Sequence, residues 1–186
     1  MRLAERLRRL DEAILGPPKH GPVPWYRQLV YALLMADTDW TSDAGRLQGY
    51  VNAHDELGVS VDPQLILPIA FHAPDAEARI TSLLQEEKPT AIFAANNTLA
   101  EGAWHVLRAL GLRLPRDVSL VGFDDVPWMA MVEPGITVVA QPTVDMGRRA
   151  AKLLLRRAED PLCAPALETL EPKLIVRGST ASPRLH

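Results

Sequence analysis

The chain has few of the features that mark secreted, membrane-spanning or nucleic-acid-binding proteins. Its 186 residues include one cysteine, Cys163, so no internal disulfide can form and a reducing, cytoplasmic location is expected. No apolar run approaches the roughly 20 residues that a membrane-spanning helix needs. The net charge of -3 and pI of about 5.9 lack the basic excess that neutralises phosphates, so this chain alone is not expected to hold DNA tightly.

Most sequence templates for catalysis are missing as well. There is no glycine-rich phosphate loop of the dinucleotide-binding or Walker type, and no nucleophile elbow. The histidines and Cys163 lack the spacing of metal ligands, so neither a metal nor a cofactor is expected. The adjacent carboxylates Asp124 and Asp125 are the most enzyme-like residues, but no second catalytic group accompanies them. We therefore expect a protein that is not an enzyme, with a small α/β enzyme using Asp124 as the alternative.

Residues 1–28 differ in pattern from the rest of the chain. Apolar residues recur at helical spacing over residues 2–14, which predicts an amphipathic helix. A solvated charged face is favoured over a membrane-binding or nucleic-acid-binding one. The segment lacks the continuous apolar region and cleavage site of a secretory signal. Residues 16–25 contain four prolines and two glycines, which predicts a linker or loop.

From residue 29 onward, short apolar runs alternate with longer helical patterns. This alternation predicts an α/β domain with a parallel, doubly wound sheet. Strands are expected at residues 29–35, 65–70, 91–95, 118–122, 136–139 and 174–177. Helices are expected at residues 43–57, 74–88, 98–110 and 143–158, with a short helix beginning around Pro127. Thr98 and Glu101 have the spacing of a capping box at the start of the third of these helices.

Polar residues follow three successive strands of this predicted sheet. Asn96, Asp124 and Gln141 each lie where a strand ends, and the carboxyl ends of strands are where open α/β sheets bind ligands. We assign Asn97 to the helix cap and Asn96 to the ligand. Asp124 is the better ligand candidate of the acidic pair, whereas Asp125 either caps the helix at Pro127 or faces the cleft.

Three further residues are candidates for the same site. Arg46 is expected in the first turn of its helix, where the helix dipole disfavours a cation. A compensating anionic or polar ligand is one explanation, and an ordinary surface arginine is the other. Phe71 and Trp128 have the chemistry of an apolar wall for a sugar ring, and core packing explains each equally well.

Five segments in order carry a family resemblance. They are RLQGY (46–50), PTAIFAANN (89–97), GLRLPRDVSLVGFDDVP (111–127), ITVVAQP (136–142) and IVRGST (175–180). Over residues 29–183 the chain resembles the LacI/GalR family of bacterial transcriptional regulators. The resemblance implies a type I periplasmic-binding-protein-like fold, in which two α/β lobes joined by crossing strands hold a ligand between them. It also implies a homodimeric repressor controlled by a small-molecule effector, with a sugar expected here.

The resemblance also implies roles for five residues. Arg46 resembles an arginine that binds effector hydroxyls or a carboxylate, and Asn96 matches a polar effector contact. Asp124 matches an acidic contact to the ligand. Gln141 matches a contact where the chain crosses between lobes. Phe71 lies about where the family often has an aromatic wall, which is a weaker correspondence.

A complete family member begins with a helix-turn-helix headpiece, a hinge helix and most of a first lobe, and these patterns do not precede Leu29. We therefore expect mainly the second lobe, at residues 29–140 and 171–183, with residues 141–170 forming a crossover helix of the first lobe. DNA binding is then expected only through a headpiece absent from this chain, and no membrane partner is expected. A free-standing sugar- or solute-binding module is the alternative.

Without a first lobe, the helix at residues 143–158 is expected to expose its apolar face. That face carries Met146, Ala150, Leu153 and Leu154. An exposed apolar patch of this kind marks an interaction surface or favours aggregation. We expect either the helix at residues 2–14 or a second chain to cover it.

Overall fold

Six strands form one sheet in the computed structural model, which describes residues 31–36, 41–69 and 74–182. They are β1 (Tyr31–Ala36), β2 (Ile66–Ile69), β3 (Ala91–Ala94), β4 (Ser119–Phe123), β5 (Thr137–Ala140) and β6 (Lys173–Ile175). The strand order is β2-β1-β3-β4-β5-β6, and every neighbouring pair is parallel except β5 and β6. The predicted α/β fold with a parallel sheet is confirmed, except that β6 is antiparallel to β5.

The helices of the described part connect these strands. They are α2 (Thr41–Leu57), the short 3-10 helix η2 (Pro63–Leu65), α3 (Ala76–Glu86), α4 (Asn97–Ala109), α5 (Pro127–Met131) and α6 (Thr143–Glu159). The predicted short helix at Pro127 is confirmed, because Pro127 occupies the first turn of α5. The helix predicted for residues 2–14 and the linker predicted for residues 16–25 lie outside the described residues.

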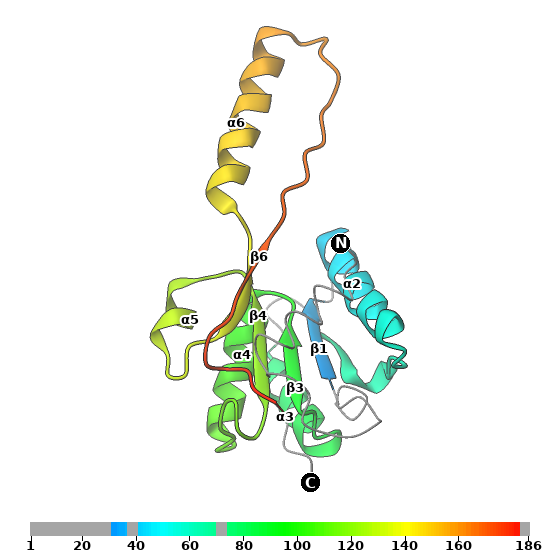
Figure 1. The fold of residues 1–186 in the computed structure, drawn as a ribbon, viewed down its shortest axis with the longest axis vertical. Coiled ribbons are helices and arrows are strands. Elements are labelled where there is room, and N and C mark those ends of the chain that lie inside the picture. The colour runs from blue at the N-terminus through cyan, green and yellow to red at the C-terminus, as the bar shows by residue number, and fades with distance from the viewer. Residues whose placement is uncertain (1–30, 37–40, 70–73, 183–186) are drawn as a thin grey trace.

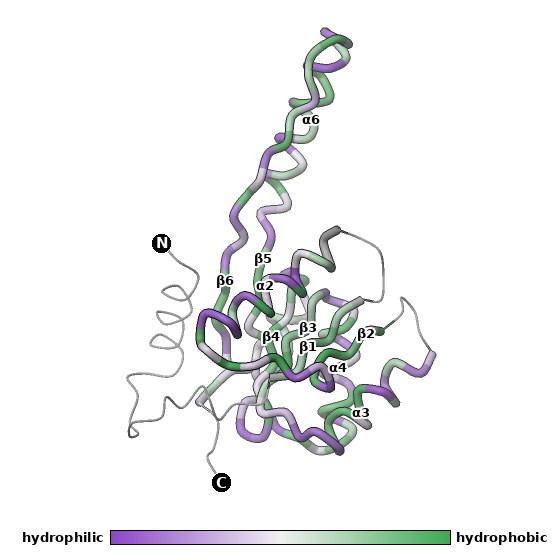
Figure 2. The backbone as a smooth tube through the Cα atoms, turned by 90° about the vertical axis from the view of Figure 1, so that its right-hand side faces the viewer, coloured by the Kyte–Doolittle hydropathy of each residue, from purple (hydrophilic) through white to green (hydrophobic). Residues whose placement is uncertain are grey.

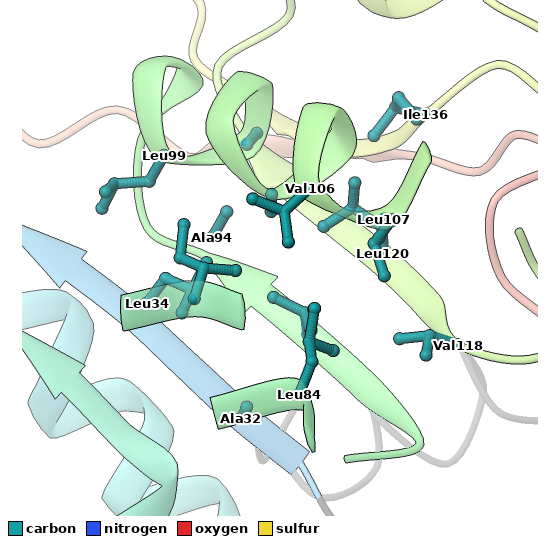
Figure 3. Close-up of a cluster of buried hydrophobic side chains, with 14 of the residues drawn as sticks. Ala32, Leu34, Leu84, Ala94, Leu99, Val106, Leu107, Val118, Leu120 and Ile136 are labelled. Atoms are coloured by element: carbon teal, nitrogen blue, oxygen red, sulfur yellow. The ribbon is translucent and has the colours of Figure 1, made fainter. Parts of the chain in front are cut away.

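Side chains of successive strand residues face opposite sides of the sheet and build two cores. On β1, Ala32 and Leu34 belong to the larger core, and Leu33 belongs to the smaller one. The larger core packs against α3, α4 and α5; Figure 3 shows its buried aliphatic side chains. The smaller core includes Tyr50 of α2 on the opposite face. Because helices cover both faces, the sheet is doubly wound and its strands read as apolar runs.

β6 is antiparallel to β5 because of the path that the chain takes between them. β5 ends at the carboxyl edge of the parallel sheet, and the chain continues into α6, which projects away from the sheet (Figure 1). The chain then returns through residues 160–172 to the same edge, so β6 runs in the opposite direction. Residues 141–172 are called the arm below.

The arm packs little against the rest of the described molecule. α6 contains no buried residue, and its Leu154 and Leu155 side chains are 70% and 63% exposed. Figure 2 shows hydrophobic positions along the projecting helix. The predicted exposure of Met146, Ala150 and Leu154 is confirmed, whereas Leu153 is half-buried. The division of the chain between two lobes remains a prediction.

The start of α4 differs from the prediction by one residue. Asn96 is the N-cap rather than Asn97, because its backbone is extended (φ -153°, ψ 170°) and its Oδ1 accepts a hydrogen bond of 2.8 Å from the Leu99 N–H. Asn97 is the first helical residue. The predicted capping box of Thr98 and Glu101 is therefore wrong, since the cap position lies two residues before Thr98.

Candidate functional site

The polar residues singled out from the sequence lie along the carboxyl edge of the parallel sheet. The chain places β2 on one side of β1 and β3 on the other, so the strand order reverses between β1 and β3. At such a reversal the connections leave in opposite directions and open a crevice, where ligands of open α/β sheets bind. Asn96 follows β3, Asp124 follows β4 and Gln141 follows β5 at this edge.

Arg46 spans the ends of β3 and β4. Its Nη1 donates a hydrogen bond of 2.8 Å to the Ala95 carbonyl, and its guanidinium carbon lies 4.1 Å from the centroid of the Phe123 ring. The prediction that Arg46 lies in the first helical turn is wrong, because α2 begins at Thr41 and Arg46 is therefore in the second turn. The dipole argument consequently does not apply, and contacts with the sheet position this side chain.

The packing of α2 explains why Arg46 faces the sheet. Tyr50, one turn further along the helix, is buried with Leu33 and Ala95 in the smaller core. Burial and the nearby negative charge of Asp62 raise the pKa of Tyr50 to about 12. Tyr50 thus anchors α2 as a neutral phenol, and residues four apart share one helix face.

Asp124 and Gln141 form the closest polar contact of the site. The Gln141 Nε2 donates a hydrogen bond of 2.6 Å to the Asp124 Oδ1. Asp124 has a positive φ of 72°, in the left-handed region that few residues other than glycine adopt, and its backbone N–H donates to the Val139 carbonyl at 3.0 Å. This unusual backbone directs the carboxylate toward the segment that leaves β5.

Asp125 does not cap α5, so of the two alternatives left open for this residue the capping role is wrong. The N-cap of α5 is Val126, which makes no side-chain cap hydrogen bond. Both carboxylate oxygens of Asp125 instead contact the Arg177 guanidinium at 2.9 Å. Arg177 lies 52 residues further along the chain, and its guanidinium gives both carboxylate oxygens a charged partner, whereas a helix cap would engage one of them.

Of the two aromatic candidates, Phe71 lies outside the described residues and Trp128 lies within them. Trp128 packs against the larger core, and its ring centroid lies 5.9 Å from that of Trp104 on α4. Of its two explanations, core packing is therefore the one observed. Phe123, which we did not single out, provides the aromatic ring beside Arg46.

A cleft of about 450 Å³ opens from this edge toward the arm. Phe123 and Gln141 line its inner end, and Met146, Leu153 and Leu167 are among the arm residues that line the rest. An ion pair of 2.8 Å between Arg149 and Glu168 joins α6 to the returning segment along the cleft. The volume of this cleft lies within the range of small-molecule pockets.

Metal-binding clusters and membrane-spanning helices are both lacking in residues 31–36, 41–69 and 74–182. No group of three or more His, Cys, Asp or Glu side chains there is arranged to hold a metal ion. No helix in that part of the chain is long and apolar enough to cross a membrane.

Comparisons with known proteins agree with this architecture. The family model for the periplasmic binding protein-like domain matches residues 26–180. The chain is 35% identical over 138 residues to the ribose operon repressor of Haemophilus influenzae, and 34% identical over 150 residues to the HTH-type transcriptional regulator DegA of Bacillus subtilis. The chain belongs to the LacI family, as its periplasmic-binding-protein-like domain. The resemblance seen in the sequence is therefore confirmed.

Solved structures give the same result for the fold of this LacI-family domain. It superposes with a TM-score of 0.74 on a transcriptional regulator CelR–cellobiose complex, at 36% identity and covering 80% of this chain and 46% of that one. It also superposes with a TM-score of 0.74 on a ribose-bound LacI family regulator from Enterococcus faecium, at 29% identity and covering 83% and 58% of the two chains.

The match covers only part of these relatives. The alignments take in 74% and 81% of the LacI-family chain described here, but 42% of the ribose operon repressor and 44% of DegA. The chain thus spans less than half the length of these curated relatives. Both relatives are transcriptional regulators by name, and the part that matches the family model is the periplasmic binding protein-like domain.

Proposed function

We propose that this domain binds a sugar-like effector at the carboxyl edge of its sheet, through Arg46, Asn96, Asp124 and Gln141. The main support is the contact between Asp124 and Gln141 next to the Arg46–Phe123 stack, which brings together side chains distant in sequence. The carboxylate accepts hydrogen bonds from hydroxyls, and the guanidinium and carboxamide groups donate them. An aromatic ring packs against the apolar face of a sugar.

Asn96 and Phe71 complete the proposed site. Because the Asn96 oxygen caps α4, its NH2 group is the part of the side chain that would donate to the ligand. Phe71 would supply a second aromatic wall. The ribose and cellobiose bound by the two structural relatives support a carbohydrate as the ligand class.

Binding is favoured over catalysis by the contacts of Asp124. Its hydrogen-bonding partner Gln141 is a carboxamide, which does not change its protonation state near neutral pH. Acid–base chemistry needs a positioned titratable group, and a carboxamide cannot serve as one.

We further propose that the domain works in the cytoplasm as a homodimeric part of a repressor. DNA contact would come from a separate helix-turn-helix headpiece, consistent with the net charge of -3 of this chain and with the relative DegA, an HTH-type regulator. The arm would then pack against a first lobe of the same regulator, and the effector would lie between the lobes.

A thermal-shift screen with substitutions at Asp124 tests the effector site. A panel that includes ribose and cellobiose is added to the native chain, to Asp124→Asn and to Asp117→Asn as a control that removes a charge at the opposite edge of the sheet. Asn tolerates the left-handed backbone of Asp124, so this variant removes the charge with little change in folding. A ligand at 100 times its Kd stabilises the native state by about 2.7 kcal/mol.

We expect one sugar to raise the melting temperature of the native chain and of Asp117→Asn but not that of Asp124→Asn. If no member of the panel shifts a cooperative melt of the native chain at high millimolar concentrations, the proposed effector site is wrong. A shift that persists in Asp124→Asn would mean that the sugar binds elsewhere.

A further inference from the structure

Two adjacent carboxylates contact chain segments on either side of the arm: one segment leaves β5 for the arm, and the other follows β6 after the chain has returned. Asp124 accepts the hydrogen bond of 2.6 Å from Gln141, on the segment that leaves β5 for the arm. Asp125 pairs with Arg177, on the segment that follows β6 after the chain has returned. The turn at residues 124–125 therefore contacts the first residue of the arm and the segment beyond β6.

Arg177 makes further hydrogen bonds besides its ion pair with Asp125. Its Nη1 also donates a hydrogen bond of 2.9 Å to the Ile136 carbonyl, and its backbone N–H donates at 3.0 Å to the Thr137 hydroxyl. A Cβ added at Gly135 would lie 3.2 Å from the Arg177 Cδ, so the side chain passes close over that glycine. With the side chain only 19% exposed, this guanidinium has one well-defined position.

We propose that Arg177 is a positioning residue for the ligand-binding carboxylate. By holding Asp125 from both oxygens, it keeps the turn in the conformation that gives Asp124 its φ of 72° and directs its carboxylate to Gln141. A left-handed conformation costs even an aspartate more than a right-handed one, although Asp and Asn adopt it more often than other non-glycine residues, so loss of the restraint lets the turn relax. The role in ligand binding rests on the proposed function; the role in orienting Asp124 does not.

The same arrangement links ligand binding to the arm. A sugar hydroxyl that contacts Asp124 competes with Gln141, the first residue of the arm, for the same carboxylate oxygen. Arg177 keeps the segment beyond β6 attached to the turn while this exchange occurs. The ligand thereby acts on the segment that leaves β5 for the arm and leaves the segment beyond β6 in place.

The test compares four single variants by a measurement that needs no ligand. The side-chain amide signals of Gln141, assigned by their loss in Gln141→Ala, are recorded by NMR in Arg177→Gln, Arg177→Lys, Asp125→Asn and Arg113→Gln. Arg113 is a matched control, because it makes a similar bidentate pair with Asp117, at 2.8 and 3.0 Å, before β4 rather than after it.

We expect Arg177→Gln and Asp125→Asn to move the Gln141 amide signals toward those of a solvated glutamine. A fifth protein that combines these two substitutions should move them no further. Arg177→Lys should move them less, because it retains the charge, and Arg113→Gln should leave them unchanged. The inference is wrong if the Gln141 signals are unchanged in folded Arg177→Gln and Asp125→Asn proteins, whether or not their melting temperatures fall.

Ribose and cellobiose as probes then separate this inference from the proposed function. If either binds the native chain, Arg177→Gln should weaken its affinity roughly three- to tenfold, the size of coupling expected between neighbouring residues. If neither these nor other sugars bind while the Gln141 signals move as expected, the proposed function fails and the positioning role stands.

Discussion

At the scale of single residues, two pairs of identical residues adjacent in the sequence have different roles. The sequence pattern does not show which member of each pair has which role. Asn96 and Asn97 both have suitable chemistry for a helix cap, but only Asn96 is extended and accepts the Leu99 N–H. Asp124 and Asp125 likewise contact different partners, Gln141 and Arg177. In both pairs the backbone conformation decides which residue serves which role.

The two asparagines give a direct test of this assignment. We expect Asn96→Ala to lower the free energy of unfolding by about 1 kcal/mol, since an N-cap is lost. Asn97→Ala should change it by less than about 0.5 kcal/mol, because this residue is already helical. Urea denaturation of both variants measures the difference.

Asn96→Asp serves as the control for this experiment. It retains the capping oxygen and should keep the stability of the native chain, while it removes the NH2 group proposed to contact the ligand. Equal losses of stability in Asn96→Ala and Asn97→Ala would contradict the cap assignment.

At the scale of elements, α4 and α6 show how differently two amphipathic helices are placed. Leu107 of α4 is 1% exposed within the larger core, whereas Leu154 of α6 is 70% exposed. Both helices show helical apolar spacing in the sequence. That spacing indicates which face is apolar, but only the path of the chain determines whether anything lies against it.

This contrast predicts that two leucine substitutions change the free energy of unfolding by very different amounts. Leu107→Ala should lower the free energy of unfolding by about 2–5 kcal/mol, because it leaves a cavity in a packed core. Leu154→Gln should change it by no more than about 0.5 kcal/mol. Chemical denaturation measures both. A large loss in Leu154→Gln would mean that another part of the chain, or a second copy, covers α6.

At the scale of the whole molecule, a second exposed surface lies outside the arm, on α4 and α5, whose Trp104 and Trp128 rings contact each other. Met131 is 81% exposed there, and the Arg108 guanidinium lies 5.0 Å from the centroid of the Trp104 ring. Methionine, arginine and aromatic residues are the types enriched in protein interfaces. We infer that the proposed homodimer forms through this surface, whereas the arm would contact a first lobe.

Light scattering coupled to size-exclusion chromatography tests this interface. We expect the native chain and Leu154→Gln to have the mass of a dimer, and Met131→Glu to have the mass of a monomer, because a charge would be buried in an apolar contact. If Met131→Glu remains a dimer and Leu154→Gln becomes a monomer, the arm rather than the α4–α5 surface forms the interface.

The sequence by itself determined the class of fold, the order of the elements, the family and the edge of the sheet where polar residues gather. These follow from local patterns, namely apolar periodicity, glycine and proline positions, and short motifs such as GFDD, which depend on neighbours in the chain. Phe123 was within reach of the same reasoning, since alternation along β4 places it on the face opposite Gly122, toward α2.

Only the tertiary structure decided that Arg46 lies between Ala95 and Phe123, that Asp125 pairs with Arg177, and that β6 is antiparallel. The partners in each contact are far apart in sequence, and no local pattern encodes a pairing across 49 or 52 residues. Such contacts form where separate elements meet in space, because the favourable hydrogen bonds and charge pairing depend on distances that only the folded chain supplies.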